Sequence, residues 1–137
     1  MQLIPRHDPH LLVRSSDGHT VAALLGELDL VQVRRLRPEF DALVRESDAL
    51  TVDVRRLAFC DVTGLGLLAH GAGRARAGGV RWWLVCDQPW LLRLIRLTAL
   101  DELLRPRPFA PYGALDPVVP SRPPGPVDPG RCDEVVP

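Results

Sequence analysis

Residues 49–77, ALTVDVRRLAFCDVTGLGLLAHGAGRARA, contain the two elements around which the chain is organised. Residues 50–54 form a short valine-containing run, which fits a strand that is covered on both faces. A helix opening near Thr63 is predicted by residues that recur at helical spacing: Leu65, Leu68, Ala72 and Ala75. Asp61 and Thr63 would then lie at a helix N-terminus, where free N–H groups and the helix dipole favour negative charge. We therefore expect any functional site here.

The composition predicts one packed domain followed by a proline-rich segment. The chain has 137 residues and 46% apolar content, enough for a hydrophobic core. Of its 14 prolines, 10 follow Arg105. Proline lacks the N–H donor that helices and sheets use, so this segment should continue neither. We expect a short N-terminal arm at residues 1–9, a domain at 10–104 and a disordered proline-rich tail at 105–137.

Charge and cysteine usage narrow the class of protein. Basic and acidic residues balance at 17 each, so no strong field attracts nucleic acid or anionic lipid. The cysteines, Cys60, Cys86 and Cys132, follow no metal-ligand spacing and suit a reducing compartment. No apolar run reaches the length of about 18 residues that a membrane span needs. We expect a soluble cytoplasmic protein with no cofactor, metal, nucleic acid or membrane partner, and its oligomeric state stays open.

The first part of the domain is predicted to be a hairpin followed by a helix. Residues 10–14 and 20–25 flank an Asp17-Gly18 pair, which supplies the positive φ angles of a tight turn. Asp29 is the expected N-cap of the helix, with Gln32 as its capping-box partner. The expected buried stripe is Leu30, Val33, Leu36, Phe40, Leu43 and Val44. Pro38 should kink this helix or delay its start.

Later elements complete an α/β order. Residues 80–86 read as a strand with Trp82 and Trp83 on opposite faces, and residues 90–98 as a helix. Leu103 and Leu104 are predicted to form a last short strand. The resulting alternation predicts one α/β domain with a mostly parallel sheet of four to five strands and interleaved helices.

No catalytic constellation stands out, so we expect no enzyme. The histidines are scattered, and His70 is expected to be solvated on the central helix. Asp53 and Asp61 flank one loop, but a strand-end carboxylate that accepts loop N–H groups is commoner than a catalytic acid.

A dinucleotide-binding site is the most specific ligand-binding alternative that the sequence offers. Gly64-Leu65-Gly66-Leu67-Leu68-Ala69 fits the glycine fingerprint of such sites, and Asp87 lies about 20 residues further on. Asp61 would repel a pyrophosphate, however, and the chain is short for two mononucleotide halves. Close packing of the helix on the sheet explains the glycines equally well.

The motifs together resemble the STAS domains of bacterial anti-sigma factor antagonists, across about residues 11–104. The matching segments, in the order of that family, are Gly26-Glu27-Leu28-Asp29, residues 51–54, residues 57–59, residues 61–66, Gly78-Gly79 and residues 97–101. The resemblance implies a non-enzymatic transcription regulator that binds an anti-sigma factor, often a serine kinase, and releases its sigma factor. It also implies a phosphorylation switch at the residue after Asp61, because a phosphate there would repel the partner.

The sequence departs from that pattern at the switch. The usual phosphoacceptor position holds Val62, which has no hydroxyl, and Thr63 is better explained as the N-cap of the central helix than as an acceptor. Ala99 replaces the family's usual glycine, and the proline tail stands where a final helix is usual. The protein is therefore either a constitutive antagonist, an antagonist switched through Thr63, or a STAS scaffold in a stress-sensing or transport complex. The expected partner-binding residues are Asp29, Asp61, Val62, Thr63, Gly64, Leu65, Gly66, an exposed Leu67, His70 and Arg74.

Overall fold

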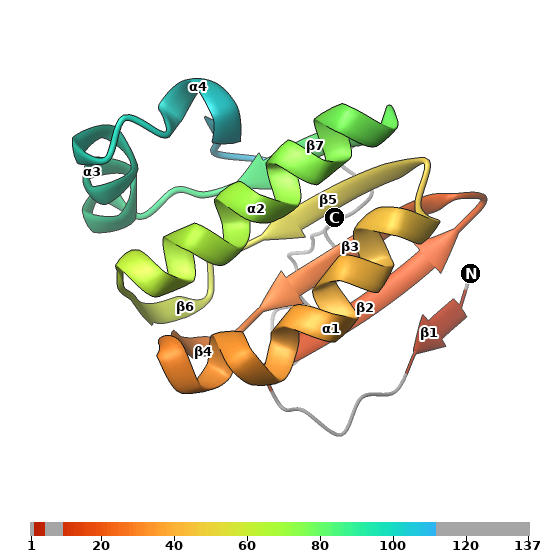
Figure 1. The fold of residues 1–137 in the computed structure, drawn as a ribbon, viewed down its shortest axis with the longest axis horizontal. Helices are drawn as coiled ribbons and strands as arrows, with labels where there is room; N and C mark the ends of the chain where they lie inside the picture. Colours follow the sequence, from red (N-terminus) through yellow and green to blue (C-terminus); the bar gives the residue numbers. More distant parts are fainter. Residues whose placement is uncertain (1, 5–9, 112–137) are drawn as a thin grey trace, which may run out of the picture.

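The computed structural model describes residues 2–4 and 10–111, and the remaining residues lie outside this description (Figure 1). The cysteine at position 132 and the tail beyond residue 111, both discussed above, are among the latter. The elements are β1 (Gln2–Ile4), β2 (Leu11–Ser16), β3 (His19–Leu24), β4 (Gly26–Leu28), α1 (Leu30–Glu46), β5 (Ala49–Asp53), β6 (Leu57–Cys60), α2 (Val62–Gly78), β7 (Arg81–Val85), α3 (Pro89–Leu97), α4 (Asp101–Leu104) and β8 (Pro106–Arg107).

The main sheet has the order β1-β2-β3-β5-β7-β8. The pairs β1–β2 and β2–β3 are antiparallel, whereas β3–β5, β5–β7 and β7–β8 are parallel. The prediction of an α/β fold with a mostly parallel sheet is confirmed. The described part of the sheet has six strands instead of four to five, because β1 and β8 add to its two edges.

The hairpin of β2 and β3 forms as predicted. Asp17 and Gly18 have φ angles of 51° and 80°, the left-handed pair that a two-residue hairpin turn requires. β3 then lies between β2 and β5, in the interior of the sheet.

Helix α1 begins at the predicted cap, with two differences from expectation. Asp29 Oδ1 accepts a hydrogen bond from the backbone N–H of Gln32 at 3.1 Å, but the Oε1 atom of Gln32 has no partner, so only half of the capping box forms. Leu30 is 48% exposed instead of buried, because it is the first helical residue and lies beyond the end of the sheet. The helix runs through Pro38, so the expectation of a late start is wrong.

Helices α1 and α2 cover one face of the sheet (Figure 1). The ring of Phe40 packs edge-on against Trp82 with 6.4 Å between centroids. Gly71 of α2 permits this packing, because a Cβ there would overlap the Phe40 ring. Burial of a side chain of this size contributes roughly 1.5–3 kcal/mol, so the contact between α1, α2 and β7 is a main part of the core.

The chain after β7 differs from the prediction in two places. Leu103 and Leu104 belong to the short helix α4, so the strand expected there is wrong. A strand does form two residues later, although the tail was expected to make none. Proline at position 106 costs this edge strand nothing, because the pairing uses the carbonyl of Arg107, which accepts from the N–H of Cys86 at 2.7 Å.

Candidate functional site

Two short strands bring the starts of α1 and α2 together. A short loop was expected between the strand at residues 50–54 and the helix near Thr63, but Leu57–Cys60 forms β6 there, which pairs in parallel with β4 in a separate two-stranded sheet. Leu28 lies opposite Cys60 in this pair, and the N–H of Asp61 donates to the carbonyl of Leu28 at 3.4 Å. Since α1 follows β4 and α2 follows β6, both helices begin at the same end of the molecule (Figure 1).

The N-cap of α2 is Asp61, not Thr63 as predicted. Asp61 is extended, with φ −106° and ψ −170°, and its Oδ1 accepts from the N–H of Gly64 at 3.0 Å. Strand pairing in β6 holds the backbone before the helix extended, which places the Asp61 carboxylate over the free N–H groups. Thr63 is already the second helical residue, and its side chain is half-buried.

Val62 is the exposed side chain at this helix start. It is the first residue of α2 and is 67% exposed. An isopropyl group therefore occupies the position where the related proteins were expected to carry a hydroxyl. The hydroxyl belongs to the following residue, Thr63, which is half-buried.

Gly64 and the leucines that follow it serve packing. Gly64 lies directly against the backbone oxygen of Leu28, and a Cβ there would overlap it. This close approach supports the packing explanation of the glycine fingerprint. Leu65 and Leu67 are both fully buried, so the prediction of an exposed Leu67 is wrong. Helix α2 contacts α1 on one flank and α4 on the other, which buries more of its surface than one leucine stripe. Gly66 is exposed, with open space where a side chain would lie.

The two remaining predicted residues lie further along α2. His70 is half-buried and its Nε2 lies 3.2 Å from Oδ1 of Asp41 on α1, so it faces the neighbouring helix instead of solvent. Arg74 is exposed. At a rise of 1.5 Å per residue, Arg74 lies about 18 Å along the helix from Val62. The structure thus gathers Asp29, Asp61 and Val62 at one end and separates Arg74 from them.

Three exposed apolar residues at the same end were missed by the sequence analysis. Leu30 and Val31 form the first turn of α1, and Phe59 lies in β6 opposite Glu27. Val31 and Phe59 are 61% and 47% exposed. Helical periodicity assigned Leu30 to the core, and no pattern in the four residues of β6 distinguishes Phe59 from a buried residue. We call Leu30, Val31, Phe59 and Val62 the helix-start surface.

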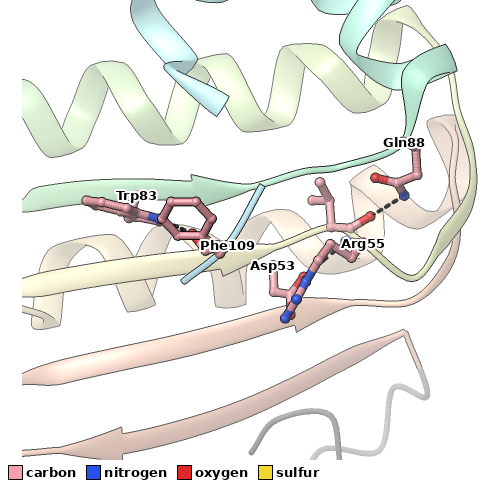
Figure 2. Close-up of polar contacts among 6 residues, drawn as sticks. Asp53, Arg55, Trp83, Gln88 and Phe109 are labelled. Carbon is pink, nitrogen blue, oxygen red and sulfur yellow. Dashed lines mark hydrogen bonds and ion pairs between the residues drawn. The ribbon is translucent and has the colours of Figure 1, made fainter. Parts of the chain in front are cut away.

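Asp53 is a structural carboxylate, as the sequence analysis favoured. It is buried at the end of β5 and accepts from the backbone N–H and Nε of Arg55 at 3.0 Å and from its Nη2 at 2.9 Å (Figure 2). Gln88 stabilises the same region, because its Nε2 donates to the carbonyl of Val54 at 2.6 Å. These bonds fix the connection between β5 and β6, and hence the position from which α2 starts.

The cysteines near the site are buried thiols. Burial, followed by the nearby carboxylate of Asp61, raises the pKa of Cys60 to about 12. Burial also raises the pKa of Cys86 to about 11. Neither side chain is a thiolate nucleophile near neutral pH. Within residues 2–4 and 10–111, no group of three His, Cys, Asp or Glu side chains converges to hold a metal ion. None of the helices in these residues has the length and apolarity for crossing a membrane.

Comparison with known proteins identifies the fold. The family model described as "Mlab, STAS domain" matches residues 11–106. The chain belongs to the STAS domain family. This confirms the resemblance on which the sequence analysis relied. No curated protein matches this STAS domain.

Solved structures resemble this STAS domain over most of their length. An anti-sigma factor antagonist from Mycobacterium paratuberculosis is 28% identical with a TM-score of 0.67, covering 81% of this chain and 91% of that one. The anti-sigma factor antagonist SpoIIAA in its unphosphorylated form is 20% identical with a TM-score of 0.63, covering 80% and 96%. The Bacillus cell fate determinant SpoIIAA in its phosphorylated form is 21% identical with a TM-score of 0.61, covering 79% and 98%. The two SpoIIAA structures support the shared fold.

Proposed function

We propose that this STAS domain is an anti-sigma factor antagonist. It binds an anti-sigma factor of the serine kinase type and thereby releases a sigma factor for transcription. Family membership and the 28% identical antagonist support this proposal. The observation that carries it is the helix-start surface, where four apolar side chains are exposed together at the end of two capped helices.

The chemistry of this surface fits a protein partner. Exposed apolar side chains are typical of interaction sites, and because these are already partly buried, each contributes on the order of 1 kcal/mol when a partner covers the rest of it. Three carboxylates, those of Glu27, Asp29 and Asp61, lie among them. A partner with a basic rim around an apolar centre is therefore complementary in both respects.

We infer that the protein acts constitutively. Val62 offers no acceptor oxygen at the exposed position, and Thr63 is half-buried. A phosphate on Thr63 would add about −1.5 to −2 charges beside the Asp61 carboxylate, which already accepts from the helix N–H groups. Both effects disfavour phosphorylation of Thr63.

Binding to a kinase-type anti-sigma factor from the same genome tests the proposal. Val62→Asp places a charge in the helix-start surface, and we expect it to weaken binding at least tenfold in calorimetry. Phe109→Asp is the matched control, because Phe109 is similarly exposed at 62% but lies on the side of the sheet away from α1 and α2. Equal loss in both variants, or no binding by the wild type, contradicts the proposal.

Phosphotransfer from labelled ATP tests the absence of a switch. We expect Val62→Ser to incorporate phosphate with the cognate kinase, while the wild type and Thr63→Ala do not. Labelling of the wild type that disappears in Thr63→Ala would instead place a switch at Thr63.

A second candidate function is a STAS scaffold in a stress-sensing or transport complex. The lack of a hydroxyl at Val62 favours this alternative, because such a scaffold needs no phosphoacceptor. Failure to bind any kinase-type anti-sigma factor, together with assembly into such a complex that Val62→Asp abolishes, would support it.

A further inference from the structure

The sheet has a second face, opposite α1 and α2, which we call the open face. Alternation along the strands assigns Val21 and Ala23 of β3, Thr51 of β5 and Trp83 of β7 to it. None of the described helices lies over this face (Figure 1). Even so, Val21, Ala23 and Thr51 are only 6%, 2% and 1% exposed. Val21 and Ala23 form a small apolar cluster of their own, separate from the main core, and an apolar segment packed on this face would enlarge it.

The last described residues run onto the open face. After β8, the carbonyl of Phe109 accepts from Nε1 of Trp83 at 2.9 Å (Figure 2). The guanidinium of Arg107 lies 5.1 Å from the Trp83 ring centroid, a cation–π contact. Pro111 then lines a cavity of about 150 Å³ together with His19, Thr51 and Trp83. The chain thus passes from β8 over Trp83 of β7 toward the first residues of β5 and β3.

We propose that residues 112–120, YGALDPVVP, continue along this path and dock on the open face over Val21 and Ala23. The occupant is the protein's own proline-rich tail, bound as an extended segment without sheet pairing. The direction of residues 106–111, set by the contacts of Trp83, carries this inference. It does not depend on the proposed regulatory function.

The length of the segment fits the distance. A polyproline-like chain rises about 3.1 Å per residue, so nine residues span roughly 28 Å. Neighbouring strands lie about 4.8 Å apart, so the three steps from β5 to β1 require only roughly 14 Å. The segment can therefore cross the whole remaining width of the sheet.

The chemistry of the segment also fits the surface. Leu115, Val118 and Val119 are apolar partners for Val21 and Ala23. Pro117 and Pro120 bury no unsatisfied N–H group when they pack against side chains. Aromatic-lined grooves are the usual receptors of such segments, and the cavity beside Pro111 is lined by Trp82 and Trp83.

Paramagnetic broadening in the full chain tests the proposal. In the double variant Ser121→Cys, Cys132→Ser, a nitroxide is attached to the cysteine introduced at position 121. Cys60 and Cys86 do not react with the label, because they are buried and their pKa values are raised. We expect amide signals of β2 and β3 to broaden strongly while those of α1 and α2 do not. Equal broadening on both faces of the sheet overturns the proposal. So does broadening that appears only between molecules in a mixture of labelled and unlabelled chains, which would indicate a second copy.

The tail itself provides a matched pair of variants. Val-Val-Pro occurs at residues 118–120 and again at 135–137. Adding Val118→Asp and Val119→Asp to the labelled chain should abolish the selective broadening of β3, because two carboxylates cannot pack on Val21 and Ala23. The same change at Val135 and Val136 should leave it intact. Both pairs of substitutions lie outside the described residues 10–111. If both pairs, or neither, abolish the broadening, docking through residues 112–120 is wrong.

Discussion

The two faces of the sheet are built from the same strands but are stabilised in different ways. Under α1 and α2, Leu50, Val52 and Leu84 are fully buried and contribute through apolar packing. On the open face, Thr51 of β5 accepts or donates a hydrogen bond with His19 at 3.2 Å, and Asp53 is bound by Arg55. Neighbouring residues of one strand therefore have different roles. The cost of a substitution should depend on the face to which its side chain points.

The largest expected effect is on the helix-covered face. Phe40→Ala leaves a cavity between α1, α2 and Trp82, and we expect the free energy of unfolding to fall by about 3–5 kcal/mol. Leu12→Ala, at a position of β2 on the open face that is 36% exposed, should lower it by only about 1 kcal/mol. Urea denaturation measures both. Similar losses would mean that the two faces are not distinct in energy.

Polar contacts stabilise the open side, and Asp53→Ala removes three of them. We expect a loss of about 1–3 kcal/mol, because the N–H of Arg55 loses its acceptor while its guanidinium, which is partly exposed, regains water. Asp48→Ala, at an exposed carboxylate just before β5, is the control and should change stability by less than about 0.5 kcal/mol. If Asp53→Ala also lowered the free energy of unfolding by less than about 0.5 kcal/mol, polar contacts would not stabilise the open face.

The stability of helix α2 depends on its N-cap residue, Asp61. Asp61→Ala removes the acceptor of the Gly64 N–H and should lower stability by about 1 kcal/mol. Thr63→Ala, two residues on, should cost at most about 0.5 kcal/mol. Chemical denaturation of the two variants distinguishes the caps, and a larger loss for Thr63→Ala would contradict the observed geometry.

The smallest expected effect is an increase in stability, at Ala99. Ala99 has φ 58°, a left-handed conformation that strains a residue with a Cβ, so Ala99→Gly should raise stability by up to about 1 kcal/mol. Ala77→Gly, at an exposed helical position of α2, should lower it by about 0.5–1 kcal/mol. Thermal unfolding with opposite shifts for the two glycines would support this assignment, and shifts of the same sign would contradict it.

Local periodicity predicted most of the fold from the sequence. The Asp17-Gly18 turn and the buried stripe of α1 depend on neighbouring residues alone, and both form, except that Leu30 is exposed. The pairing of β4 with β6 was not predictable in this way, because segments of three and four residues have no measurable period. Their register is decided by contacts between positions about 30 residues apart.

The sequence predicted where the candidate site lies, at the start of the central helix, but not the role of each residue in it. The sequence was sufficient to place Val62 at the start of the central helix, where the family resemblance predicts a hydroxyl. It did not distinguish Asp61 from Thr63 as the cap, since both are good capping residues and the choice depends on how β6 ends. Leu67 was misassigned because helix α2 also packs against other helices, which helical spacing in one segment cannot reveal.

The pairing of β4 with β6 has a consequence for genetics. Residues 27–31 and 59–62 are distant in the chain, yet the pairing of β4 with β6 fixes their positions relative to each other. A substitution that destabilises the pairing from one segment should therefore be compensated by substitutions in the other. Suppressor mutations of a change near residues 27–31 would then be found near residues 59–62, and the reverse.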